Sequence, residues 1–157
     1  MKIQQLCDVP GLIPEIANLY FEEWGRFNSK LKQSDIEANL QCYLKRDEIP
    51  LAVIAFENNS LVGVAQLKIR ELSLYPQYKY WLGGVFVKPE CRGTAVGSNI
   101  VQHASKLAKS LNVSELYLQT LRLDGGLYRQ LGWQAVERFT HDGHSKLLMV
   151  YKFLSMK

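Results

Sequence analysis

The sequence predicts an α/β or α+β fold, a single domain in which helices flank a mixed sheet. Three observations carry this prediction. Segments with helical hydrophobic spacing alternate with strand-like segments, the apolar run Tyr80 to Val87 is typical of a strand buried on both faces, and a glycine-containing turn leads from that run into a helix. The expected order is strand, two helices, three strands, helix, strand, helix and two strands.

The N-terminal part predicts two helices after an initial strand. Behind a Pro-Gly pair, apolar residues recur at helical spacing as far as Trp24. Ser34 and Glu37 have the spacing of a capping box before Leu40, which predicts that a second helix begins at Ser34.

The middle of the chain predicts three strands. The segment LAVIAFENNSLVGVAQLKIR contains two β-rich runs around the polar stretch ENNS, the pattern of a hairpin. The run Tyr80 to Val87 follows and should be the central strand. Gly83-Gly84 interrupts it, which indicates a bulge or a close backbone approach, or else an accommodation to packing in a crowded sheet.

The last part predicts a helix, a strand, a short helix and a closing hairpin. SELYLQT is typical of a strand, and GGLYRQLG of a short helix that ends at Gly132. WQAVERFT and SKLLMVYKFL should pair around HDGH, where Asp142-Gly143 is a strong turn signal. The apolar stripe of the longer helix comprises Ile100, Val101, Ala104, Leu107, Ala108 and Leu111.

Composition indicates an ordinary globular chain. With 157 residues, 47% hydrophobic and 22% charged, we expect one domain over residues 1–157. The net charge of +4 favours an anionic ligand but is too scattered to predict nucleic-acid binding. The three cysteines show no CxxC spacing, MKIQQLCDVPGL lacks a signal-peptide core, and no apolar run could span a membrane. We therefore expect a cytoplasmic protein with reduced thiols and no membrane association.

The stretch VKPECRGTAVGS carries the clearest chemical signal. A strand that turns sharply into a helix leaves backbone N–H groups without partners, and the helix dipole adds to their attraction for an anion. The amides from Arg92 to Ser98 could therefore hold a pyrophosphate, with Arg92 adding charge. The plain structural alternative is a tight turn that needs glycine and an exposed arginine.

Two motifs together resemble the GNAT superfamily of N-acetyltransferases. VKPECRGTAVGS is similar to the acetyl-CoA loop V-x-P-x-x-R-G-x-G-x-G/A, and GLYRQLGW is similar to a later A-x-x-x-Y-x-x-x-G-F segment. The resemblance implies a mostly antiparallel sheet with a splayed central strand, and acetyl-CoA as co-substrate. It assigns cofactor binding to Val85, Phe86, Val87, Arg92, Gly93, Thr94, Ala95, Val96, Gly97 and Ser98.

Ala95 departs from the family pattern, which most often has a glycine there. A methyl group is harmless if Ala95 has helical φ and ψ, and costly if φ is positive or the backbone must touch phosphate. The departure therefore concerns the affinity for coenzyme A and leaves the predicted fold unchanged.

The resemblance implies that Tyr128 is the general acid that protonates the departing thiolate. Its hydroxyl can donate a proton at neutral pH. A core-facing aromatic is the alternative. Amine attack also needs a proton acceptor, for which Glu71 and then Asp124 are the candidates, although either could be a solvated loop carboxylate.

Metal and covalent chemistry are not expected. HDGH contains two histidines and an aspartate, but no further ligand cluster accompanies it. Cys91 lies beside the predicted anion site without a defined base partner, so direct transfer is preferred over an acyl-cysteine.

The resemblance places the acceptor between the connection of the first two helices and the loop after the third strand. The aromatic residues there could bind an amine or simply pack together. They are Trp24, Phe27, Tyr75, Tyr78 and Trp81.

The function that follows is acetyl transfer from acetyl-CoA to a primary amine of a small molecule in a ternary complex. The alternatives are a protein N-terminal or lysine acetyltransferase, or a non-catalytic acyl-CoA-binding module, for which Ala95 and the absence of an obvious base are the grounds. The sequence is also compatible with a homodimer.

Overall fold

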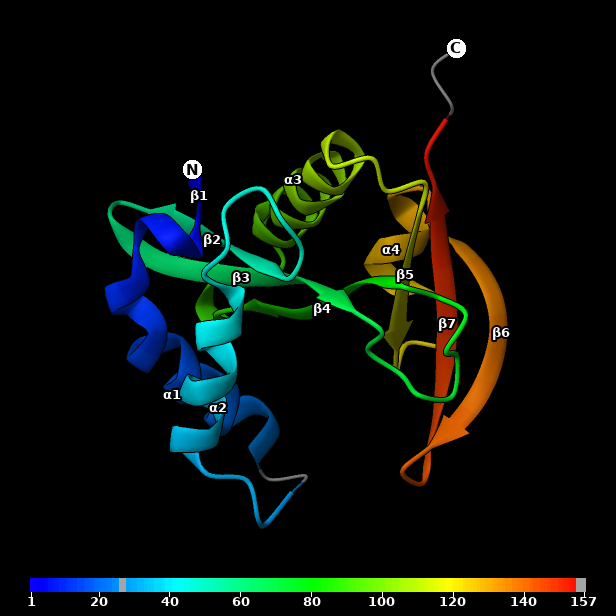
Figure 1. Cartoon of the computed structure of the whole chain (residues 1–157), viewed down its shortest axis with the longest axis horizontal. Helices are drawn as coiled ribbons and strands as arrows, with labels where there is room; N and C mark the ends of the chain where they lie inside the picture. The colour runs from blue at the N-terminus through cyan, green and yellow to red at the C-terminus, as the bar shows by residue number, and fades with distance from the viewer. Residues whose placement is uncertain (26–27, 155–157) are drawn as a thin grey trace.

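Seven strands form one sheet in the order β1-β2-β3-β4-β5-β7-β6 (Figure 1). The computed structural model describes residues 1–25 and 28–154. Neighbouring strands are antiparallel except β4 and β5, which are parallel. The strands are β1 (Lys2–Gln5), β2 (Leu51–Glu57), β3 (Ser60–Ile69), β4 (Tyr80–Val87), β5 (Glu115–Thr120), β6 (Gln134–His141) and β7 (His144–Lys152).

In the described part of the chain, four α-helices cover the two faces of this sheet (Figure 1). They are α1 (Ile13–Trp24), α2 (Gln33–Leu40), α3 (Val96–Ser110) and α4 (Gly126–Gln130). The helices α1 and α2 lie together on one face, where their apolar residues form one core cluster with residues of β2 and β3. The helix α3 packs on the other face, with Tyr128 and Leu131 from the region of α4 against the same core. The predicted order of elements and mixed sheet are confirmed.

A third apolar cluster lies at the start of β4, on the face that α1 and α2 occupy elsewhere. It combines Leu72 and Tyr75 from the loop after β3 with Trp81, Tyr117 and Leu148 from the sheet. The loop is therefore fixed to the sheet by buried side chains.

The hairpin predictions are confirmed by their backbone angles. Asn58 and Asn59 both have positive φ between β2 and β3, and Asp142 and Gly143 do so between β6 and β7. Two consecutive positive φ angles are typical of the two-residue turns that suit the twist of a hairpin.

The second helix begins earlier than predicted. Its first residue is Gln33, and the carboxylate of Asp35 accepts the backbone N–H of Lys32 at 3.1 Å, so Ser34 and Glu37 do not form the expected capping box. An acidic residue at the third helical position can cap the preceding N–H whether or not a Ser or Thr comes before it.

The central strand β4 is irregular at the two glycines. The pairing runs from Val64↔Phe86 to Gln66↔Gly83, so that β4 has one residue more than β3 over this interval. Gly84 has φ of +56°, a conformation that favours glycine. On its other edge β4 pairs with β5 only at Trp81↔Tyr117, so the two parallel strands separate beyond that point.

None of the helices in the described part of the chain is both long and apolar enough to cross a membrane.

Candidate active site

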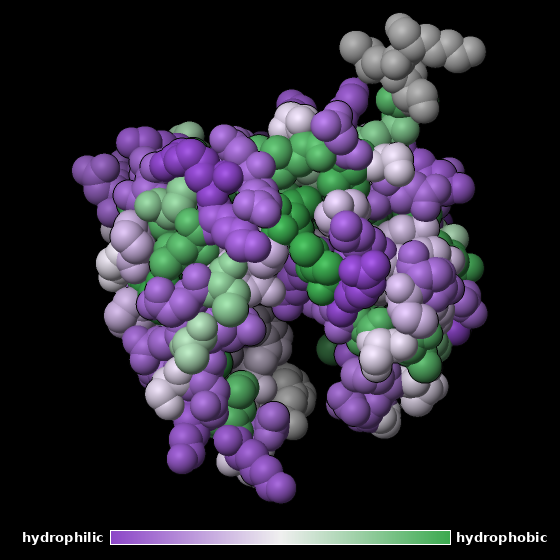
Figure 2. Space-filling view, in the orientation of Figure 1, coloured by the Kyte–Doolittle hydropathy of each residue, from purple (hydrophilic) through white to green (hydrophobic). Residues whose placement is uncertain are grey.

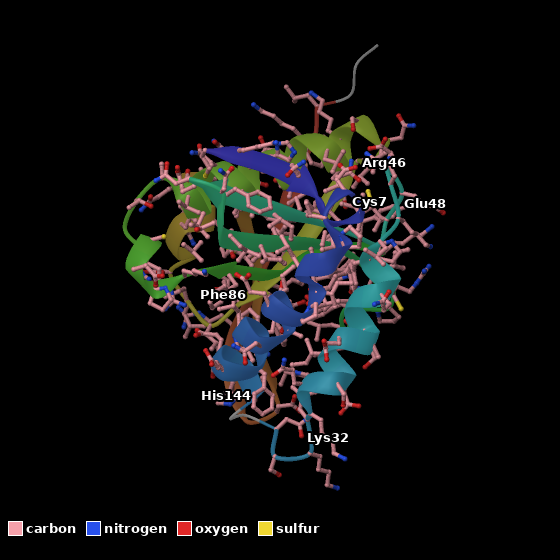
Figure 3. All side chains as sticks on the ribbon, turned by 90° about the vertical axis from the view of Figure 1, so that its left-hand side faces the viewer. Cys7, Lys32, Arg46, Glu48, Phe86 and His144 are labelled. Atoms are coloured by element: carbon pink, nitrogen blue, oxygen red, sulfur yellow. The ribbon has the colours of Figure 1, made fainter. Side chains whose placement is uncertain are left out.

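A cleft of about 820 Å³ opens where β4 and β5 separate. In Figure 2 it is a deep notch between the surface of α1 and α2 and that of the β6–β7 hairpin. Lys32, just before α2, and His144, at the start of β7, lie at the same end of the molecule (Figure 3). Residues from α1, α2, β3, β4, β5 and β7 line the cleft, together with Tyr128 and Glu71.

The turn from β4 into α3 presents unpaired backbone N–H groups over part of the predicted segment Arg92 to Ser98, but the N–H of Arg92 itself is paired, because it donates to Pro89 O at 3.3 Å. Apart from Val96, the other residues of this segment make no backbone N–H hydrogen bond within the described part of the chain. The N–H of Val96 donates a hydrogen bond to Thr94 Oγ1 at 3.4 Å. Such a set of amides at the start of a 15-residue helix suits an anion. The groups belong to Gly93, Thr94, Ala95, Gly97 and Ser98, which we call the amide cradle.

Ala95 has φ of −80° and ψ of 2° at the N-cap position of α3. These angles are accessible to alanine, so its methyl group introduces no backbone strain. Gly93, by contrast, has φ of +79° and open space around it, which gives its lack of a side chain a conformational reason. Glycine is thus present at position 93, where the positive φ favours it, and alanine is present at position 95, where the backbone angles permit a side chain.

The Arg92 side chain lies back along the end of β4. Its Nε donates to Val87 O at 2.8 Å, one terminal nitrogen lies 3.5 Å from Glu23 Oε2, and the guanidinium stands 5.6 Å from the Phe86 ring centroid. Figure 3 shows Phe86 beneath α1. Arg92 therefore joins the cradle to β4 and α1, and its guanidinium is engaged by protein groups.

Tyr128 borders the cleft from α4. Its ring packs edge-on to Trp133 with centroids 6.1 Å apart, and no other described residue hydrogen-bonds its hydroxyl. Burial, and then the negative charge of Glu71, raise the pKa of Tyr128 to about 12. The hydroxyl therefore keeps its proton throughout the neutral range and is available as a donor.

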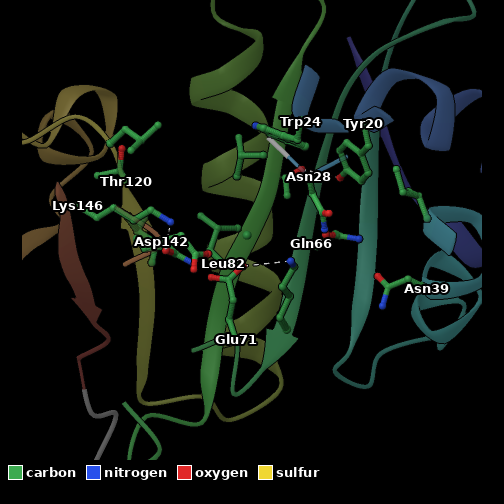
Figure 4. Close-up of a pocket in the computed structure, with 18 of the residues that line it drawn as sticks. Tyr20, Trp24, Asn28, Asn39, Gln66, Glu71, Leu82, Thr120, Asp142 and Lys146 are labelled. Carbon is green, nitrogen blue, oxygen red and sulfur yellow. Dashed lines mark hydrogen bonds and ion pairs between the residues drawn. The ribbon is translucent and has the colours of Figure 1, made fainter. Parts of the chain in front are cut away.

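Glu71 borders the same cleft from the loop after β3. Its side chain is 15% exposed, and Oε1 lies 3.1 Å from Lys68 Nζ (Figure 4). Its other oxygen, Oε2, is buried and without a partner in the described structure. A Cβ on Gly83 would lie 2.6 Å from Glu71 Oε1, so the glycine leaves room for this carboxylate against β4.

Asp124, the second candidate base, does not line the cleft. Its side chain is 70% exposed, pairs with Arg122 at 3.2 Å and accepts the N–H of Gly126 at 2.9 Å. These contacts lower the pKa of Asp124, with the Arg122 hydrogen bond as the main cause. Asp124 thus stabilises the entry to α4, which leaves Glu71 as the better-placed carboxylate.

Two residues that sequence reasoning missed hold the bulge of β4. The buried Tyr20 of α1 donates its hydroxyl to Gly84 O at 2.6 Å, and a Cβ on Gly84 would overlap the side-chain oxygen of Gln66. Both line the cleft (Figure 4). The only available signal was a polar residue, Gln66, inside an otherwise apolar strand; Tyr20 looked like any other apolar residue of its helix.

Most of the aromatic residues expected at the acceptor site are structural. The Tyr78 ring stacks on Tyr117 at 3.9 Å, Trp81 Nε1 donates to Tyr78 O at 2.8 Å, and Tyr75 is buried in the same cluster. Of the expected five, Trp24 lines the cleft, whereas Phe27 lies outside the described residues. The loop folds onto β5 and β7, so Tyr75, Tyr78 and Trp81 pack together against the sheet.

The HDGH segment forms a turn, and no group of three or more possible metal ligands occurs among residues 1–25 and 28–154. Cys91 is half-buried in the short turn before the cradle, against the core under α3.

Comparison with known proteins decides the family. The profile described as "Acetyltransferase (GNAT) family" matches residues 13–133. This chain belongs to the GNAT acetyltransferase family. The GNAT match includes the cradle, Glu71 and Tyr128, and the family makes the protein an acetyltransferase enzyme. No curated protein matches the sequence significantly.

Solved structures of GNAT proteins share the fold of this acetyltransferase. An aminoglycoside 6'-N-acetyltransferase complexed with coenzyme A is 16% identical, with a TM-score of 0.74 over 100% of this chain and 99% of the other. A ribosomal-protein-alanine N-acetyltransferase from Brucella melitensis is 15% identical, with a TM-score of 0.78 over 98% and 100%. The yncA protein from Salmonella typhimurium, solved with acetyl-CoA, is 16% identical, with a TM-score of 0.69 over 100% and 96%.

Proposed function

We propose that this GNAT protein transfers the acetyl group of acetyl-CoA to a primary amine of a small molecule, by direct attack in a ternary complex. The observation that carries the proposal is the arrangement of three features along β4. The amide cradle lies at the end of β4, the edge of β4 is open beyond Trp81, and Tyr128 and Glu71 both line the space beside that edge. Known structures with this fold hold coenzyme A or acetyl-CoA.

In this proposal the cradle binds the pyrophosphate of the co-substrate. Its five N–H groups have no partner in the described chain and lie at or just before the first turn of α3, the positive end of that helix. Arg92 stabilises the position of the cradle through the hydrogen bond from its Nε to Val87 O. The backbone of Val85, Phe86 and Val87 would then pair with the pantetheine arm, since β5 has left this edge of β4 unpaired.

The chemistry assigned to the chain consists of two proton transfers and one hydrogen bond. Glu71 accepts the proton that the amine loses as its nitrogen bonds to the thioester carbonyl carbon, either directly or through a water molecule. A backbone N–H of β4 donates to the carbonyl oxygen as that oxygen gains charge. When the carbon–sulfur bond breaks, Tyr128 gives its proton to the leaving thiolate, and the products are an amide and a free thiol.

The test is the release of free thiol from acetyl-CoA in the presence of a panel of amines, with mass spectrometry to identify acetylated products. The panel holds small amines, peptides with free N-termini and peptides with an internal lysine, because a fold neighbour acetylates a ribosomal protein. Acetylation of small amines above both peptide classes is the expected result. Binding of acetyl-CoA with no turnover on any amine would instead indicate a non-catalytic module.

A further inference from the structure

The charges that line the cleft are balanced. Its ionisable lysine and carboxylate side chains are Lys68, Glu71, Asp142 and Lys146, two of each sign. Glu71 and Lys68 form an ion pair at 3.1 Å, and Asp142 lies at the rim with its side chain 82% exposed. A substrate with several ammonium groups would need an excess of carboxylates in the cleft, and these lining residues do not supply one.

Lys146 is the cation in this set that has no acidic partner in the described chain. Its Nζ donates to Gln119 Oε1 at 3.0 Å, and no carboxylate of the described chain lies within ion-pair distance of it. Its neighbour two positions along β7, Leu148, is paired with Gln119, so the three side chains share one face of the sheet. Figure 4 shows Lys146 extending from β7 toward the middle of the cleft, opposite Tyr20 and Trp24.

The contact between Lys146 and Gln119 leaves hydrogen-bond donors unused. Because Oε1 of Gln119 accepts from the lysine, the amide nitrogen of Gln119 still has hydrogens to donate, as does the ammonium itself. One ammonium beside one neutral amide matches the single negative charge and two oxygens of a carboxylate. A phosphate dianion would call for further positive charge.

Glu71 is the complementary group between Lys146 and α1. Its oxygen Oε2 is buried and has no partner, which is costly for a carboxylate unless a ligand supplies a donor. A substrate amine next to β4 would supply it. The cleft thus offers a partnerless carboxylate oxygen near the splayed strand and an unneutralised ammonium farther out on β7.

We propose that the acceptor is a small amine that also carries a carboxylate, as an α-amino acid does, with its amine at Glu71 and its carboxylate at Lys146 and Gln119. This inference rests on the proposed acetyltransferase function. It separates the protein from its fold neighbours named for aminoglycosides, because those substrates carry several amines and no carboxylate.

The experiment compares matched acceptors that differ in one group. For each of several side chains, kcat/KM is measured for the amino acid, its neutral amide and the corresponding amine without a carboxyl group, with an aminoglycoside as a fourth class. The expected result is a preference of about tenfold to a hundredfold for the amino acid over its amide, the usual effect of one charge-assisted hydrogen-bonded contact.

Two variants of β7 locate the effect. Lys146→Met should raise KM for the amino acid about tenfold or more while kcat/KM for the amide stays nearly constant. Lys152→Met, the same change at an exposed position outside the cleft, is the matched control and should leave both values unchanged. Thermal unfolding of both variants shows whether they are folded.

The outcomes separate the two proposals. Equal or better turnover of amides, plain amines or the aminoglycoside overturns the inference while leaving the acetyltransferase proposal intact. A preference for amino acids that Lys146→Met does not reduce also overturns it, because the carboxylate would then bind elsewhere. Acetyl-CoA binding without turnover of any acceptor overturns the proposed function and this inference with it.

Discussion

At the residue scale, Tyr128 is the group on which the proposed mechanism depends most directly. Its ring packs against Trp133, the residue lines the cleft, and its hydroxyl has no hydrogen-bond partner in the described structure. Tyr128→Phe removes the proton donor and keeps the packing, so turnover should fall by roughly 10²–10⁴ while the affinity for coenzyme A changes little. Steady-state kinetics and a binding titration measure the two effects.

A donor with a more acidic thiol provides the control for that variant. A better leaving group needs less help from an acid, so the loss caused by Tyr128→Phe should shrink with such a donor. Unchanged turnover of the variant on a confirmed acceptor would show that Tyr128 is structural.

Glu71 and Asp124 form a matched pair of carboxylates, because only the first lines the cleft. Glu71→Gln keeps the shape of the side chain and removes the proton acceptor, so kcat should fall by about 10² or more. Asp124→Asn should keep near-normal activity and stability, because the side-chain oxygen of asparagine can accept the Gly126 N–H in this turn as aspartate does. Measured together, equal losses in the two variants would contradict the assignment of Glu71 as the base.

At the scale of elements, the bulge of β4 determines the shape of the open edge. Gly84 has a positive φ, and an added Cβ would meet Gln66 and lie 2.9 Å from the Tyr20 hydroxyl. We expect Gly84→Ala to cost about 1–3 kcal/mol of unfolding free energy through this strain and to lower activity in the folded fraction at least tenfold. Chemical denaturation and kinetics measure the two quantities.

Gly11→Ala serves as the control for Gly84→Ala. Gly11 has no atom within 4 Å of an added Cβ and its φ is not positive, so the substitution should change neither stability nor activity appreciably. If Gly84→Ala behaved in the same way, the bulge would not be a constraint on the site.

The start of α3 allows a test of the alanine in the cradle. Because the backbone angles of Ala95 suit alanine, Ala95→Gly should leave the Kd for coenzyme A nearly unchanged and cost up to about 1 kcal/mol of stability through backbone entropy. Isothermal titration and denaturant unfolding report the two numbers. A tenfold or larger gain in affinity would show that the native cradle is weakened, and would favour the non-catalytic alternative.

At the scale of the whole molecule, ligand binding should couple to global stability. A ligand that binds only the folded state adds about 2.7 kcal/mol at a concentration of one hundred times its Kd. We expect coenzyme A and acetyl-CoA to raise Tm in a concentration-dependent way, and pantetheine, which lacks the pyrophosphate, to raise it far less. No shift with either cofactor at millimolar concentration would remove the proposed function.

Local patterns in the sequence determined most of the architecture. The order of elements follows from hydrophobic spacing, and the hairpin turns follow from residues that accept positive φ. The turn of β4 into α3 is predictable for the same reason, since both the unpaired amides and the glycine at position 93 belong to one continuous segment. Asp35 rather than Glu37 caps α2: the helix has two acidic residues near its start, and the position at which the folded chain begins the helix decides which of them accepts the N–H of Lys32.

Only the tertiary structure decided which side chains meet in the cleft. Tyr20 and Gly84 are 64 residues apart in sequence, yet their hydrogen bond fixes the bulge. Glu71 is the better-placed of the two candidate carboxylates because its loop folds onto the sheet beside Gly83, whereas Asp124 accepts a hydrogen bond in the local turn before α4. The loop aromatics pack against β5 and β7. Lys146 lies in the cleft, where its partner is Gln119 and no carboxylate pairs with it in the described chain. Such contacts depend on how elements that are distant in sequence pack together. Local sequence patterns therefore do not predict them.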